Sequence, residues 1–270
     1  MKIGVNKWTM PPDWSLDKAF EAAVEAGFDT IEINVGETGE LTPDTSEAEA
    51  RSIAARARDA GIEVSSLSTG LGWAYPLTDG DPAKAGRGVA NTEAQIRLAR
   101  WMGLDAILCV PGMVTPDVPY DVAYERAQAA LRRLEPVAAE NRVVIGVENV
   151  WNKFLLSPIE MARFVDEIGS PWVQVYFDVG NVLVFGYPQQ WIRILGKRIK
   201  KVHVKDFRAN VGNITGFANP LQGDVPWIDV REAFADVGYD DVVTAEVEGY
   251  RVQPEIGLRH IAEALRSVFA

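Results

Sequence analysis

The sequence is poor in the features that mark secreted, membrane-spanning and nucleic-acid-binding proteins. Cys109 is its single cysteine, so the chain can form no internal disulfide and nothing indicates an oxidising compartment. Lys and Arg total 27 against 38 Asp and Glu, and the net charge of −11 argues against nucleic acid or an anionic membrane as a partner. No apolar run approaches the ~20 residues that span a bilayer. The N-terminal stretch MKIGVNKWTM contains no apolar signal segment, so we expect a soluble, cytoplasmic protein.

Histidines and phosphate-binding loops are also scarce. The two histidines are His203 and His260, and His260 lies in a charged C-terminal helical segment, where we expect it on the surface. Neither GxGxxG nor GxxxxGK[ST] occurs, and this disfavours the main alternative fold, a doubly wound open sheet. Cys109 lies in the apolar run AILCV and is interpreted as an inert core residue.

Strand-like and helix-like stretches alternate along the whole chain. The expected strands are KIGVN, TIEINV, EVSSLST, AILCV, VVIGVE, VQVYFD, KKVHVK and VVTAEV, and a helical pattern follows each one. The helix before AILCV is expected from about Asn91 to Met102. Eight βα units in a chain of 270 residues predict an α/β protein with a (β/α)8 TIM barrel, as a single domain over residues 1–270. The long loops 70–81 and 209–226 both follow strands, so we expect them to cover the substrate at the C-terminal mouth of the barrel.

Four consecutive predicted strands carry a metal-ligand residue at or near their C-terminal ends. These residues are Glu148, Asp178, His203 and Glu246. Alone, each has an ordinary explanation, because an acid at a strand end often caps the next helix and a single histidine is often a hydrogen-bonded core residue. Together they interrupt strands that should be apolar, and strand alternation allows all four to point toward the barrel axis. Two Glu, one Asp and one His suit a divalent ion that leaves room for substrate oxygens.

Other residues near the predicted site have two interpretations each. Lys205 shares the inward face of its strand with His203, and it either binds a substrate oxygen or phosphate or pairs with Glu148 or Asp206. Glu32, in the middle of TIEINV, is interpreted as a member of a buried ion pair rather than a substrate ligand. Tryptophans follow three strands, and they either form an apolar wall beside a sugar or pack in the core: Trp8, Trp73 and Trp151.

Several motifs carry a family resemblance that covers essentially the whole chain. The runs are GFDTIEINVGET (27–38), VENVWN (147–152), FDVGN (177–181), HVKDFR (203–208) and VTAEVEGY (243–250). They resemble the xylose-isomerase-like sugar isomerase/epimerase superfamily. The most similar branch is that of the L-ribulose-5-phosphate (L-xylulose-5-phosphate) 3-epimerases, often labelled hexulose-6-phosphate isomerases, and the ketose 3-epimerases of the D-tagatose/D-allulose type are similar too.

The resemblance implies roles for individual residues. It makes Glu148, Asp178, His203 and Glu246 the ligands of one divalent ion, with Mn2+ expected first and Co2+, Mg2+ or Zn2+ as alternatives. It also makes Glu148 and Glu246 the acid/base pair. Substrate contacts are expected from Arg208, Lys205, Asn181 and Trp8. Asn181 stands where free-ketose epimerases have a substrate-binding histidine, which favours the phosphosugar-like branch or an unassigned one. A homodimer or homotetramer is expected.

The expected activity is 3-epimerisation of a ketose or ketose phosphate through a metal-stabilised enediolate. Aldose–ketose isomerisation and dehydration of a keto-polyol remain alternatives, because both also begin with proton removal beside a carbonyl. Endonuclease chemistry on a trinuclear zinc site would need several more histidines than the two present, and the acidic surface would repel DNA. A catalytically silent barrel that serves as a binding subunit is the remaining alternative.

Overall fold

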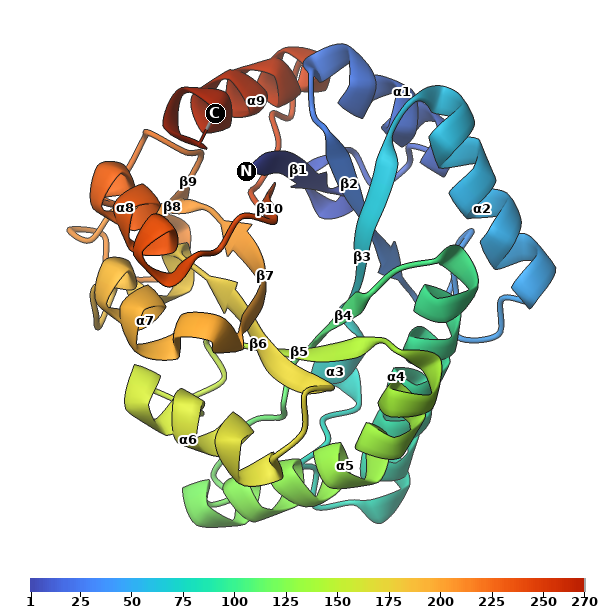
Figure 1. The fold of residues 1–270 in the computed structure, drawn as a ribbon, viewed down its shortest axis with the longest axis vertical. Coiled ribbons are helices and arrows are strands. Elements are labelled where there is room, and N and C mark those ends of the chain that lie inside the picture. Colours follow the sequence, from blue (N-terminus) through green and yellow to red (C-terminus); the bar gives the residue numbers. More distant parts are fainter. Residues whose placement is uncertain (270) are drawn as a thin grey trace.

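Eight parallel strands close into a barrel in the computed structural model, which describes residues 1–269 (Figure 1). They are β1 (Lys2–Asn6), β2 (Thr30–Val35), β3 (Glu63–Thr69), β4 (Ala106–Cys109), β5 (Val144–Glu148), β6 (Val173–Asp178), β7 (Ile199–Val204) and β10 (Val242–Ala245). Each strand pairs with its neighbour along the chain, and β1 pairs with β10 through Ile3 and Val243 to close the ring. The predicted fold class is confirmed.

Helices form the outer layer of the barrel (Figure 1). They are α1 (Leu16–Ala26), α2 (Glu47–Ala60), α4 (Pro82–Met102), α5 (Tyr120–Asn141), α6 (Pro158–Ile168), α7 (Pro188–Leu195), α8 (Trp227–Val237) and α9 (Pro254–Phe269), while the short helix α3 (Leu71–Ala74) directly follows β3 and lies inside this ring. Helix α1 shows how local sequence sets these bounds. The Ser15 side chain accepts a hydrogen bond from the Lys18 amide, and Gly27 ends the helix in the left-handed conformation. None of the helices in the described residues combines the length and apolar character needed to span a bilayer.

The helix expected from about Asn91 begins nine residues earlier, so that boundary was wrong. Asp81 caps the helix by accepting a hydrogen bond from the Ala83 amide, and Pro82 occupies the first turn. Two glycines in the first turns hide this start in the sequence. One of them, Gly88, is required by packing, because a Cβ atom there would lie 2.3 Å from the Tyr75 carbonyl oxygen.

The long loop after β7 contains an antiparallel hairpin that the sequence did not predict. Strands β8 (Asp206–Phe207) and β9 (Phe217–Ala218) are only two residues each. The hairpin is anchored by the buried carboxylate of Asp206, which accepts hydrogen bonds from the Val225 amide and the Trp227 indole. This anchoring places Phe217 over the C-terminal mouth of the barrel, where it lines a cavity.

The two faces of the barrel strands differ in character. The faces that pack against the helices contribute a largely apolar, fully buried core that includes Ile3, Ile31, Ile145 and Val202. Buried polar and charged side chains lie in the middle and at the C-terminal ends of the strands, among them Asn6, Glu32, Ser66, Glu148, Asp178 and His203. Such groups are costly to bury unless they pair with each other or with a ligand, so this end of the barrel is where function is expected.

Candidate metal centre

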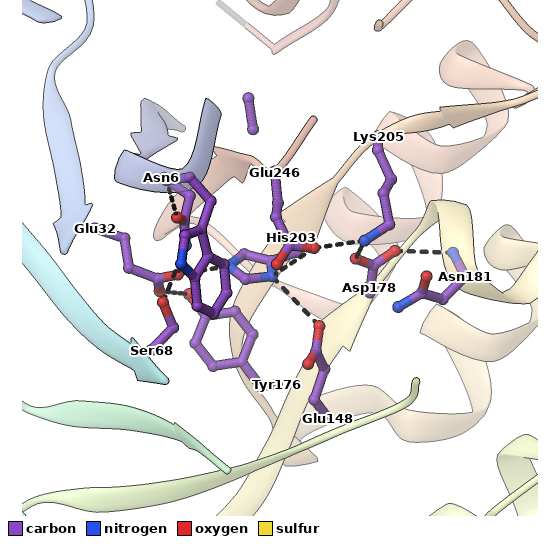
Figure 2. Close-up of polar contacts among 12 residues, drawn as sticks. Asn6, Glu32, Ser68, Glu148, Tyr176, Asp178, Asn181, His203, Lys205 and Glu246 are labelled. Carbon is purple, nitrogen blue, oxygen red and sulfur yellow. Dashed lines mark hydrogen bonds and ion pairs between the residues drawn. The ribbon is translucent and has the colours of Figure 1, made fainter. Parts of the chain in front are cut away.

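The four predicted ligand residues lie together at the C-terminal ends of adjacent strands. Glu148 ends β5, Asp178 ends β6, His203 lies in β7 and Glu246 follows β10. One ligand atom from each lies within 4.8 Å of the others. In-register pairing sets Asp178 beside His203, and Thr244 beside the same histidine on the next strand. Figure 2 shows Glu148 and Glu246 approaching the cluster from opposite sides.

The carboxylate of Glu32 orients the His203 ring from the side opposite the cluster (Figure 2). Nε2 of His203 lies 2.7 Å from Oε1 of Glu32, while Nδ1 lies 3.4 Å from Glu148 and 3.7 Å from Glu246. Burial opposes ionisation of Glu32, but the charge and hydrogen bond of His203 outweigh it and lower the Glu32 pKa to about 2. The interpretation of Glu32 as a buried ion-pair member is confirmed, and Nδ1 is left facing the cluster.

Three further residues hold Glu32, and sequence reasoning did not identify them as part of the site. Asn6, Ser66 and Tyr176 all donate hydrogen bonds to its carboxylate, and all three are buried. The available signal was strand alternation, because Tyr176 lies two residues before Asp178 and therefore shares its inward face. The other two come from β1 and β3, whose register with β2 the sequence does not give.

Lys205 is paired with cluster carboxylates, although not with those expected. Its Nζ atom lies 2.8 Å from Asp178 Oδ2 and 2.5 Å from Glu246 Oε2, so the expected pairing with Glu148 or Asp206 was wrong. Asp206 points instead toward the α8 start, where it binds Trp227. Burial alone would lower the Lys205 pKa, but the surrounding carboxylates, Asp178 first, raise it well above its ordinary value.

The donor set fits a divalent cation. Burial, with the repulsion of nearby carboxylates, raises the pKa of Glu148 to about 7 and also raises that of Asp178, so an added positive charge would relieve both. Asp178 Oδ2 is buried without a hydrogen bond of normal geometry, although Lys205 lies near it. Three carboxylates and one imidazole nitrogen are ligands that Mn2+, Co2+, Mg2+ or Zn2+ accept in different degrees. That they hold a metal remains a prediction.

A cavity of about 250 Å3 opens above the cluster. Its lining includes Glu148, Lys205 and Glu246 from the cluster, three tryptophans (Trp8, Trp73 and Trp151), and Ile214 and Phe217 from the loop after β7. Asn181 also lines the cavity. Its side-chain amide donates to the Asn149 backbone carbonyl at 2.9 Å, and its backbone amide donates to the Asp178 carboxylate. Asn181 therefore fixes the turn after β6 as well as bordering the cavity.

The remaining candidates lie away from the cluster. Arg208 is exposed, its Nε donates to the Gln222 carbonyl at 3.1 Å, and it does not line the cavity. Its role in substrate binding remains a prediction. His260 is exposed on α9, as expected. Cys109 is buried, which raises its pKa to about 12 and fits an inert core thiol.

Comparison with known proteins points to one family. Relatives include SgbU of Escherichia coli K12, provisionally named an L-ribulose-5-phosphate 3-epimerase, which is 28% identical over 80% of this chain and 76% of its own length. The L-ribulose-5-phosphate 3-epimerase UlaE of Salmonella heidelberg is 24% identical over 77% of this chain and 75% of its own. Among solved structures, that of an L-ribulose 3-epimerase has a TM-score of 0.82 at 19% identity, covering 98% of this chain and 93% of the other.

The match extends over nearly the whole barrel. The sequence model of a family described as xylose isomerase-like TIM barrel matches residues 20–268, a span that contains every member of the four-ligand cluster. On this match the chain belongs to the xylose isomerase-like TIM barrel family.

Proposed function

We propose that the protein is a divalent-metal-dependent epimerase that inverts C3 of a ketose or ketose phosphate. The names of the sequence relatives support the reaction class. The observation that carries the proposal is the placement of Glu148 and Glu246, which come from β5 and from the end of β10 and approach the cluster from opposite sides (Figure 2). Inversion of a carbon by proton removal and return needs one base on each face of that carbon.

The reaction follows from these two carboxylates. One Glu takes the proton from C3, and the electron pair of the broken C–H bond moves toward the neighbouring carbonyl to give an enediolate. The other Glu, protonated at the start, gives its proton to the opposite face of C3 and becomes a carboxylate, and the carbonyl re-forms with inverted configuration. Glu148, Asp178, His203 and Glu246 would hold the ion, which when bound supplies Lewis-acid chemistry to the oxygens of the substrate.

The remaining residues of the site position this pair. Lys205 binds Glu246 and Asp178, and thereby fixes the direction of both carboxylates. Glu32 holds the His203 ring from the far side. The aromatic lining above the cluster borders the reacting carbon, and a substrate that covers it would limit the access of water to the enediolate.

Proton exchange in heavy water tests the proposal. The metal-loaded protein is incubated with a panel of ketoses and ketose phosphates in D2O with Mn2+, and the position of deuterium is read by NMR. We expect deuterium at C3 together with the C3 epimer. Deuterium at C1 or C2 would identify an aldose–ketose isomerase instead, and a product lighter by one water would identify a dehydratase.

A further inference from the structure

The cavity above the cluster has an apolar rim. Trp8 and Trp73 line it, and each is 45% exposed, while Ile214 on the loop after β7 lines it and is 66% exposed. Large apolar side chains that border a polar site and remain open to solvent usually mark a surface that a ligand covers. Trp8 follows β1, Trp73 lies in α3, and Ile214 precedes β9, so three separate loops converge on this rim.

The backbone lies close to two of the three indoles that line the cavity. An added Cβ at Gly70 would lie 4.0 Å from the Trp8 ring, so that ring lies over the end of β3. On the opposite wall, Trp151 donates its indole hydrogen to the Asn181 carbonyl at 2.8 Å and packs against Phe217 with ring centres 5.0 Å apart. Flat aromatic faces pack well against the C–H face of a sugar, because that face is apolar and uncharged.

The charges that border the cavity balance without a further anion. Among the described residues, Lys205 is the single cationic side chain of the lining, and it is held by Asp178 and Glu246. A divalent ion and Lys205 together match three carboxylates, because His203 is neutral as a metal ligand and one Glu holds the proton that it returns. These three are Asp178, Glu32 and the ionised member of the Glu148–Glu246 pair. A phosphate dianion placed in this cavity would therefore be partly desolvated without a counter-charge.

We propose that the substrate is an uncharged sugar, and that Trp8, Trp73 and Ile214 bind its non-reacting end. The inference rests on the proposed function, because it assumes that the reacting carbon lies at the cluster. It opposes the phosphosugar preference that Asn181 suggested in the sequence. Two cations on nearby loops already donate to backbone carbonyls. Arg208, outside the cavity lining, donates to Gln222, and Lys7, which lines a second cavity that also includes Trp8, donates to Pro11.

Binding measurements separate this inference from the reaction itself. Calorimetry on the Mn2+-loaded protein compares ketopentoses and ketohexoses, each paired with its terminal phosphate ester. We expect the phosphate to weaken binding at least ~10-fold, about 1.4 kcal/mol, for the ketose that binds best. Trp73→Ala and Ile214→Ala should each weaken binding of that ketose severalfold. Ile159→Ala, which removes an isoleucine that is 71% exposed on α6, is the matched control and should leave binding unchanged.

Two results would overturn the inference. The first is a phosphate ester that binds as well as or better than its free sugar, and loss of that advantage in Arg208→Ala or Lys7→Met would show where the phosphate lies. The second is the absence of binding by every neutral ketose in the panel. A neutral ketose that binds through the rim but shows no C3 exchange would refute the proposed reaction and leave the assignment of the rim intact.

Discussion

Oε1 of Glu32 lies 2.7 Å from Nε2 of His203, and this contact turns the other ring nitrogen of His203 toward Glu148 and Glu246. A carboxylate behind a ligand histidine fixes both the tautomer and the orientation of the ring. Glu32 is itself held by Ser66 and Tyr176, so the orientation of His203 depends on hydrogen bonds that reach across the barrel to β3 and β6.

Replacing Glu32 by Gln should weaken metal binding by about 10- to 100-fold, because the side chain keeps its size but loses the charge that orients His203. Competition with a fluorescent chelator gives the affinity directly. Glu63→Gln is the control, since Glu63 is exposed at the start of β3 and pairs with Lys2. Equal affinities in the wild type and Glu32→Gln would show that Glu32 has only a structural role.

Isotope exchange should separate the two proposed bases. In Glu148→Gln and in Glu246→Gln, net epimerisation should stop, while the remaining Glu still exchanges the proton on its own face of C3. Each variant, kept saturated with metal because a charged ligand is lost, should therefore wash out the C3 proton of a different epimer in D2O. Exchange of the same epimer by both variants would disprove the two-base assignment.

Metal binding should stabilise the folded protein. At a free Mn2+ concentration of about 100 times the dissociation constant, the expected gain is about 2.7 kcal/mol, which scanning calorimetry would detect as a rise of a few degrees in Tm. Asp178→Asn should remove most of this rise, because it replaces a buried ligand carboxylate by an amide. A Tm that does not respond to Mn2+, Co2+, Mg2+ or Zn2+ in the wild type would argue against the metal centre.

Arg208→Ala should lower kcat/KM at least ~10-fold, about 1.4 kcal/mol, if the guanidinium turns from the Gln222 carbonyl toward hydroxyl groups of a bound substrate. Since Arg208 is exposed, its removal should change Tm little. Steady-state kinetics and a thermal melt on the same preparation provide both readouts. Unchanged kinetics would assign Arg208 to the loop structure alone.

The carboxylate of Asp29 should make stability depend on pH in the acid range. Burial opposes its ionisation, but a hydrogen bond from the Ile3 amide and the Arg266 guanidinium outweigh it, so its pKa is lowered from 3.8. A folded-state pKa below the unfolded value means that the stabilisation is present above pH ~4 and is lost as pH falls further. Urea unfolding between pH 5 and pH 3 gives the free energy of unfolding, which should fall less steeply in Asp29→Asn than in the wild type. Asp59→Asn, which changes an exposed residue, is the control and should show the same fall as the wild type.

The barrel and the gathering of the four ligand residues follow from regular strand geometry, which is why the sequence was sufficient to predict them. Residues such as Tyr176 and Asp178, two apart on a strand, share a face whatever lies around them. The pairings of Glu32 were not predictable in the same way. They depend on register, and the β2–β3 register shifts at Ile31 and Glu32, which sets Glu32 opposite Ser66.

The paths of the loops were the other feature that could not be predicted from the sequence. The β8–β9 hairpin has strands too short for a periodic signal, and it is held by Asp206 and Trp227, which are 21 residues apart in the sequence. The position of Arg208, which donates to the Gln222 carbonyl, depends on that path. Sequence pattern therefore located the four-residue cluster but not the residues that frame it.

The position of Glu246, just after the last strand of the barrel, also determines when the site can exist during synthesis. Glu246 directly follows the strand that closes the ring, and Asn6, which binds Glu32, ends the strand on the other side of that seam. A chain emerging from the ribosome would carry Glu148, Asp178 and His203 well before Glu246 becomes available. The four-residue cluster is thus complete only once β10 has been made and has paired with β7, so a chain that stops before Glu246 lacks its fourth member.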